Sequence, residues 1–137
     1  MNRLIMVQVL LSFQIAVTSH AADWPSFRGP QANGHADDAK LPQHWSGTEN
    51  VAWKEAIAGK GWSSPVIANS RVYLTAAVPT QVTAKPDYSL RLICLDFATG
   101  KPIFDNEIFQ QDGSQSPPIH RKNSHASPTP IVEGDRA

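Results

Sequence analysis

Residues 65–71 read Pro-Val-Ile-Ala-Asn-Ser-Arg, and residues 130–136 read Pro-Ile-Val-Glu-Gly-Asp-Arg. Each stretch has a proline, two β-branched apolar residues, three further residues and an arginine. The β-branched pair favours a strand, and the Asn, Ser, Gly and Asp that follow favour a turn. The second copy starts 65 residues after the first, so the chain contains an internal repeat. Repeats at periods of tens of residues are typical of arrays in which each unit packs against the next.

Four strands are predicted from the first copy onward. We expect them at residues 64–67, 71–76, 90–96 and 101–109. Residues 78–89 and 110–124 are longer polar connections, and they account for a period above the usual blade length of about 40 to 50 residues. A unit of four antiparallel strands that then starts again is what a β-propeller blade requires. The sequence therefore predicts an all-β chain built from propeller blades.

The second copy of the repeat ends soon after it begins. The first copy continues with the apolar residues 72–74, whereas one residue follows Arg136. A strand cut at that point leaves backbone groups unpaired, and repeat units need neighbours to bury each face. We therefore expect one blade at residues 62–109, the start of the next at residues 125–137, and a natural protein that continues beyond Ala137.

The beginning of the chain has the pattern of a signal peptide. Arg3 gives a positive start, and residues 4–17 are mostly apolar and carry no charge. Ser19 and Ala21 are small residues at the two positions that a signal peptidase reads. The apolar run is too short to span a membrane comfortably. We expect residues 1–21 to be removed by cleavage after Ala21, which places the mature chain in the periplasm or outside the cell without a membrane span.

Charge and cysteine content narrow the classes of function. Twelve basic and twelve acidic residues give a formal net charge of zero. No basic field is available to attract phosphates, so nucleic acid is not expected as a partner. Cys94 is the single cysteine and stands in an apolar run, which predicts a buried thiol rather than a nucleophile.

Residues 22–49 are interpreted as an irregular N-terminal arm. Prolines and glycines interrupt this stretch, and Trp24, Phe27 and Trp45 supply large aromatic side chains. Such side chains bury a large area and would hold the arm against a surface. A sugar-binding aromatic platform is the alternative interpretation of the same three residues.

The candidate ligand site lies in the connection before the second copy. His120 and His125 stand five residues apart, but no third metal ligand of a suitable type accompanies them, and we predict no metal site. No catalytic residues are assigned in this chain. Asn123, Ser124 and His125 stand where the chain enters the innermost strand of the next blade, near the propeller axis. They either satisfy backbone groups there or line a central funnel that binds a ligand.

The turn between the third and fourth predicted strands carries a family resemblance. The sequence there resembles the repeat of quinoprotein-type propellers, which reads small residue, any, Asp, any two, Thr-Gly, any three, Trp. Cys94, Asp96, Thr99 and Gly100 fall on its positions. Phe104 stands where tryptophan is usual. It is still a flat aromatic that packs between blades, but it lacks the indole N–H donor.

Three further phrases extend this resemblance over most of the mature chain. Residues 24–30, 61–66 and 122–130 look like a group of secreted propeller-repeat proteins of planctomycete-type bacteria. The resemblance implies a full-length propeller of roughly eight blades. It makes residues 50–137 an incomplete propeller domain that resembles those of pyrroloquinoline-quinone (PQQ) enzymes, with residues 50–54 as the outer strand that closes the ring.

Two functions remain open on the sequence. The first is a non-catalytic scaffold or binding module for a protein or polymer partner in the periplasm or at the cell surface, with no cofactor in this part of the protein. The alternative is a PQQ-dependent dehydrogenase of an alcohol or sugar. That enzyme would need PQQ and calcium, and its active-site residues would lie in blades outside this chain. We favour the first because most proteins of this group resemble the quinone enzymes only in fold.

Overall fold

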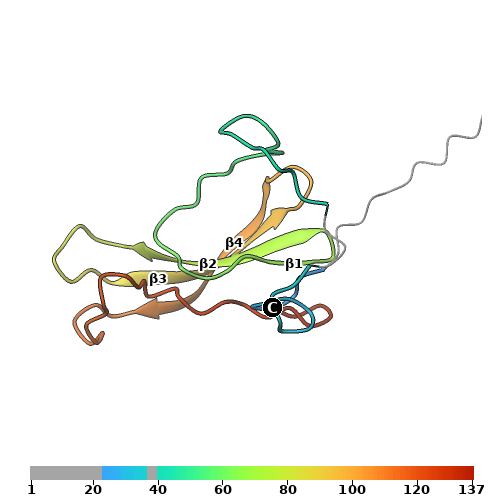
Figure 1. Ribbon diagram of the computed structural model, residues 1–137. Coiled ribbons are helices and arrows are strands. Elements are labelled where there is room, and N and C mark those ends of the chain that lie inside the picture. The colour runs from blue at the N-terminus through green and yellow to red at the C-terminus, as the bar shows by residue number, and fades with distance from the viewer. Residues whose placement is uncertain (1–22, 37–39) are drawn as a thin grey trace, which may run out of the picture.

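The computed structural model describes residues 23–36 and 40–137, so the predicted leader and its cleavage point lie outside the described residues. The described part of the chain is all-β, as predicted, and contains no helix, hence none that could cross a membrane. Four strands form one open antiparallel sheet in chain order (Figure 1). They are β1 (Val66–Ala68), β2 (Arg71–Pro79), β3 (Tyr88–Asp96) and β4 (Pro102–Gln111).

The central hairpin of the sheet is longer than the sequence predicts. The polar loop expected at residues 78–89 shortens to residues 80–87, because pairing continues to Val78 opposite Ser89 and one pair beyond. Side-chain polarity does not end a ladder that is held by backbone N–H and C=O groups. The turn predicted at residues 97–100 joins β3 to β4 as expected.

Both faces of the sheet are apolar. Successive residues of a strand point to opposite faces, and the middle strands carry apolar residues in both sets of positions. One face holds the buried cluster Val66, Ala68, Tyr73, Cys94 and Val132. The other holds the buried cluster Val72, Ala76, Ile93 and Leu95. A strand that is apolar on both sides requires cover on both sides.

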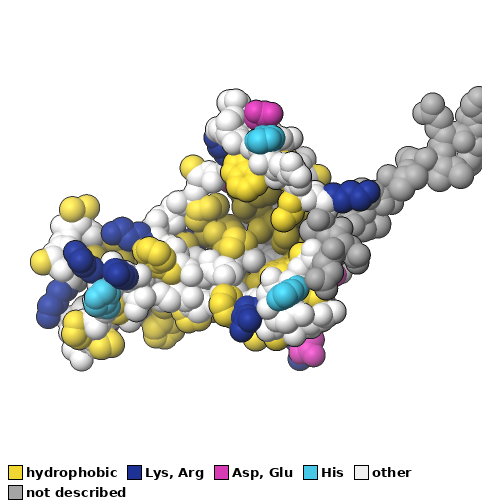
Figure 2. Space-filling model, in the orientation of Figure 1, with side chains coloured by type: hydrophobic (Ala, Val, Ile, Leu, Met, Phe, Trp, Pro, Cys, Tyr) yellow, Lys and Arg dark blue, Asp and Glu magenta, His cyan; other side chains and the backbone are white. Residues whose placement is uncertain are grey.

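Irregular segments of the chain supply part of this cover. Segment 40–62 crosses the face that carries Ile93, and its Trp53 and Ile57 pack against that cluster. The C-terminal segment, residues 112–137, runs along the opposite face (Figure 1). Figure 2 shows hydrophobic side chains gathered in the hollow between the sheet and the loop above it. The sheet is therefore the middle layer between two irregular layers.

Residues 50–54, which we predicted as a strand, form no regular secondary structure. The segment meets the sheet through the Trp53 side chain and not through a backbone ladder. A strand needs a partner for its N–H and C=O groups. In the described part of the chain no strand lies beside residues 50–54 to pair with them.

The second copy of the repeat also lacks a regular strand. Within residues 125–137 the structure has one isolated bridge, between Glu133 and Arg136, where a turn closes. The expectation of a second innermost strand is therefore not met in the described residues.

The two copies of the repeat nevertheless lie side by side. Ser64 N donates to Thr129 Oγ1 at 3.0 Å, and Asn69 Nδ2 donates to Gly134 O at 3.3 Å. Each pair is separated by 65 residues, which is the offset of the internal repeat. Equivalent positions of the first and second copies are thus joined directly by hydrogen bonds.

The N-terminal arm closes the free edge of β1. Trp24 N donates to Ile67 O at 2.6 Å, and Ile67 N donates back to Trp24 O at 2.9 Å. One residue further, Val132 N donates to Pro25 O at 2.9 Å. Ile67 and Val132 are equivalent residues of the two copies, so the arm is bonded to both of them.

Candidate functional site

The repeat motif folds into a tight turn that its own side chains hold in place. Thr99 N and Thr99 Oγ1 donate to Asp96 Oδ1 at 2.8 and 2.6 Å, and Gly100 N donates to Asp96 O at 2.8 Å. Gly100 has a φ of +73°, which costs glycine least. Asp96, Thr99 and Gly100 thus act as one unit, which we call the motif turn (residues 96–100).

Trp53 docks on the motif turn. Its Nε1 donates to Phe97 O at 2.8 Å, across 44 residues of sequence. A Cβ added at Gly100 would lie 2.5 Å from Cδ2 and 3.0 Å from Cγ of Trp53, so the indole lies directly on the glycine. Sequence reasoning placed Trp53 on a strand face and missed this contact. No pattern in the sequence links Trp53 to a turn 44 residues away.

Cys94 and Phe104 belong to the opposite face of the sheet. The two residues are paired in the register of β3 and β4, and Cys94 is fully buried. Burial raises the pKa of the Cys94 thiol, and the charge of Arg71 opposes the rise. The Phe104 ring meets Tyr73 at a centroid distance of 6.3 Å and a tilt of 58°. These residues form a packing core between β2 and β4.

The motif turn should make the free energy of unfolding fall at acidic pH, through the Asp96 carboxyl. The Thr99 hydroxyl, and then its backbone N–H, hold the pKa of the Asp96 carboxyl below its ordinary value. Because the folded pKa is lowered, these bonds stabilise fully above the unfolded pKa of about 4 and are lost as the pH falls through the folded pKa. We expect Asp96→Asn to flatten the fall of the urea midpoint between neutral pH and about pH 3.

Two controls test whether the Asp96–Thr99 hydrogen bonds cause this pH dependence. Thr99→Val removes the hydroxyl donor, so it should flatten the same part of the profile, and the two changes together should not add. Some acid dependence should remain, since the Ser114 hydroxyl lowers the pKa of Asp112 in the same way. If the urea midpoints of the wild type and of Asp96→Asn fell by the same amount as the pH is lowered, the role given to the motif turn would be contradicted.

The three predicted funnel residues have different environments. Ser124 is buried; its Oγ accepts from Ala126 N at 3.1 Å, and its own backbone N–H donates to Ser127 Oγ at 3.2 Å. Asn123 is exposed, and its backbone N–H donates to a neighbouring carbonyl. His125 packs against Tyr88 with ring centroids 4.4 Å apart. The structure thus places Ser124 within a local turn and brings His125 alone to a cavity.

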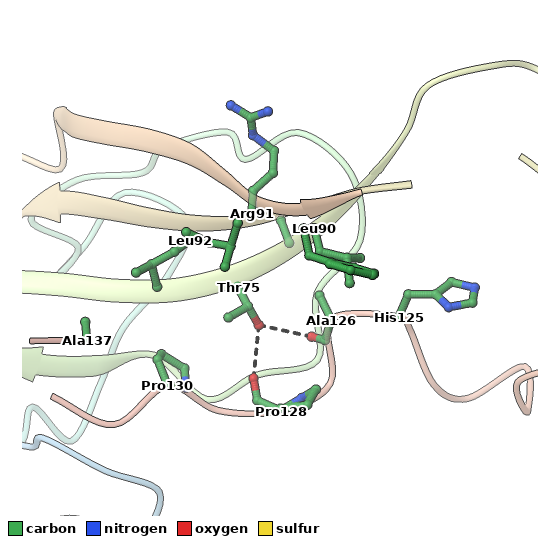
Figure 3. A pocket seen from close by; sticks show the side chains of 12 residues that line it. Thr75, Leu90, Arg91, Leu92, His125, Ala126, Pro128, Pro130 and Ala137 are labelled. Atoms are coloured by element: carbon green, nitrogen blue, oxygen red, sulfur yellow. Dashed lines mark hydrogen bonds between the residues drawn. The ribbon is translucent and has the colours of Figure 1, made fainter. Parts of the chain in front are cut away.

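That cavity is a cleft of 320 Å³ between the sheet and the C-terminal segment. The Thr75 hydroxyl lies within hydrogen-bonding distance of Ala126 O, at 3.3 Å, and of Pro128 O, at 3.1 Å, and ties the segment to β2 (Figure 3). Its walls are largely apolar, and they include Leu90, Leu92, Ile108, Phe109 and Pro130. In Figure 3 the polar ends of Arg91 and His125 point away from the other lining side chains. The cleft is therefore suited to apolar side chains.

The described residues contain no group of three or more His, Cys, Asp or Glu side chains placed to hold a metal ion. His120 instead accepts from Lys122 N through Nδ1 at 3.2 Å, within its own loop. No family, curated protein or solved structure was found to match this chain.

Proposed function

We propose that this chain is part of an exported β-propeller of the PQQ-like repeat kind, and that it is a non-catalytic scaffold that binds a protein or polymer partner in the periplasm or at the cell surface. The observation that supports this most is the pair of hydrogen bonds, Ser64–Thr129 and Asn69–Gly134, between equivalent positions of the repeat. Adjacent units of a repeat array meet through equivalent positions in this way.

The two-sided sheet supports the same proposal. A four-stranded sheet with an apolar cluster on each face is a wedge that gains stability when further sheets flank it. The docked Trp53 indole supplies the kind of contact expected between blades, since it comes from a segment outside the sheet and caps the motif turn. In this interpretation the sheet gives rigidity, and the irregular segments between strands provide the binding surface.

A direct experiment separates the scaffold from the alternative enzyme. Because the alternative places the active-site residues in blades outside these 137 residues, the test needs the full-length protein. Produced with its leader in a Gram-negative host, it would be recovered from the periplasm and supplied with PQQ and calcium. Oxidation of a panel of alcohols and sugars would then be followed with a redox dye. We expect no turnover above that of the cofactor alone, together with an N-terminus at Ala22. Quinone-dependent turnover would contradict the scaffold, and a chain retained in the cytoplasm would contradict export.

A further inference from the structure

A second cavity, separate from the cleft, lies where the arm, the entry to β1 and the second repeat copy meet. It is a groove of 590 Å³. Two aromatic side chains, Phe27 and Trp62, line it together with the hydroxyl residues Ser64, Ser127 and Thr129. We call it the aromatic groove. Its walls come from three separate parts of the sequence, so it exists only in the folded chain.

The two rings of the aromatic groove are largely exposed. Phe27 and Trp62 are each 61% exposed, although aromatic side chains of this size gain most from burial. The Trp62 backbone is fixed, because its N–H donates to Ala126 O at 3.1 Å. Because its backbone is anchored, the exposed Trp62 indole is held in place and can stack against a flat apolar surface. Exposed apolar area of this kind marks binding sites.

The hydroxyl groups beside the rings keep hydrogen-bonding capacity. Thr129 Oγ1 accepts from Ser64 N at 3.0 Å, which leaves its hydroxyl hydrogen available to a ligand. The Ser64 hydroxyl has no hydrogen-bond partner in the described part of the chain. Ser127 Oγ is occupied, since it donates to Ser124 O at 2.9 Å and thereby holds the wall in shape. The groove therefore offers at least two hydroxyl groups next to two aromatic faces.

The groove favours a neutral ligand that is not an extended peptide. None of the residues that line it is ionisable, so phosphates and acidic polymers find no opposite charge. An extended peptide would bind best by adding a strand to a sheet edge, and the edge beside the groove is that of β1. Trp24 already pairs with Ile67 along that edge. A sugar ring has apolar C–H faces and a rim of hydroxyl groups, and this matches the aromatic faces and the hydroxyl groups of the groove.

We propose that the aromatic groove binds a neutral polysaccharide, with sugar rings stacked on Trp62 and Phe27 and hydrogen-bonded to Ser64 and Thr129. This inference rests on the proposed function and names the chemical class of its polymer partner. Binding energy in such sites concentrates in a few aromatic contacts, so the rings should dominate the affinity.

The test uses the full chain with neutral oligosaccharides of glucose, N-acetylglucosamine, xylose and mannose, in the absence of quinone and calcium. Saturation-transfer NMR would report which sugar protons touch the protein, and titrations would give affinities. We expect at least one of these sugars to bind through its ring C–H protons. Trp62→Ala should weaken that binding about tenfold or more, Phe27→Ala should weaken it less, and Trp45→Ala should leave it unchanged. Trp45 is the matched control because it is 69% exposed but does not line the groove.

Three outcomes would overturn the inference. They are the failure of every neutral sugar to bind, sugar binding that survives both Trp62→Ala and Phe27→Ala in folded protein, and Trp62-dependent binding of a proline-rich peptide in place of sugars. Circular dichroism would establish that the variants are folded. The readout is binding without turnover, so failure here leaves the scaffold proposal standing. Conversely, quinone-dependent oxidation would contradict the scaffold proposal but would leave the measured sugar binding unchanged.

Discussion

Replacing Trp53 with alanine should lower the free energy of unfolding by about 3 kcal/mol. The change removes an indole that packs on the cluster around Ile93 and lies on Gly100. It also removes the hydrogen bond from Nε1 to Phe97 O. Residues 50–54 have no backbone pairing with the sheet, and the next attachments of this segment are the packing of Ile57 and the bridge from Lys60 to β2. Urea denaturation followed by circular dichroism would measure the loss.

Two companion variants separate the ring from its donor. Trp53→Phe keeps an aromatic ring but removes the N–H group, and it should cost about 1 kcal/mol beyond the smaller ring. Trp45→Ala removes an indole that is 69% exposed, and it should change stability by less than about 0.5 kcal/mol. Equal losses for Trp53→Ala and Trp45→Ala would show that the docked indole has no special role.

Replacing Gly100 with alanine should destabilise the chain by about 3 kcal/mol or more, from two separate causes. At a φ of +73°, any residue with a Cβ carries a conformational cost of about 1 to 2 kcal/mol. The new Cβ would also overlap the Trp53 ring, which has to move away from the motif turn. Overpacking of this kind typically costs about 1 to 3 kcal/mol. The same urea experiment would measure the sum.

Gly134 provides a control for the conformational part of this cost. Its φ is +62°, and a Cβ added there would meet no atom within 4 Å. Gly134→Ala should therefore cost only the conformational part. Gly100→Ala should also be milder in a Trp53→Ala background, because no ring remains to be displaced. Equal costs for the two glycine substitutions would mean that the indole does not press on Gly100.

The elements that the sequence predicts well are those that local chemistry determines. Val72, Tyr73 and Thr75 favour a strand over residues 71–76 by their own propensity. Asp96 with Thr99 and Gly100 makes its turn from residues close together in the sequence. Residues 50–54 carry the same apolar alternation but form no strand. Pairing is a property of two segments, and their strand character was predicted from one segment alone.

The candidate sites show the same difference between features set by neighbouring residues and features set by distant segments. Ser124 lies in a turn that adjacent residues suggest, whereas the aromatic groove combines Phe27, Trp62 and Thr129 from distant parts of the chain. No spacing in the sequence links Phe27 to the other two, because nothing in a linear pattern tells which loops will meet. The internal repeat was the one long-range clue, and the contact between Ser64 and Thr129 follows its offset.

The pairing of the arm with both repeat copies has a consequence for synthesis. Trp24 and Pro25 are made early, but Pro25 bonds to Val132, which lies near the far end of the described chain. Until Val132 emerges, this part of the arm lacks one of its two attachments, and the edge of β1 has only a short bridge to protect it. An unprotected sheet edge recruits other strands and promotes aggregation. A newly made chain therefore keeps this part of the β1 edge exposed until Val132 is available to bond to Pro25.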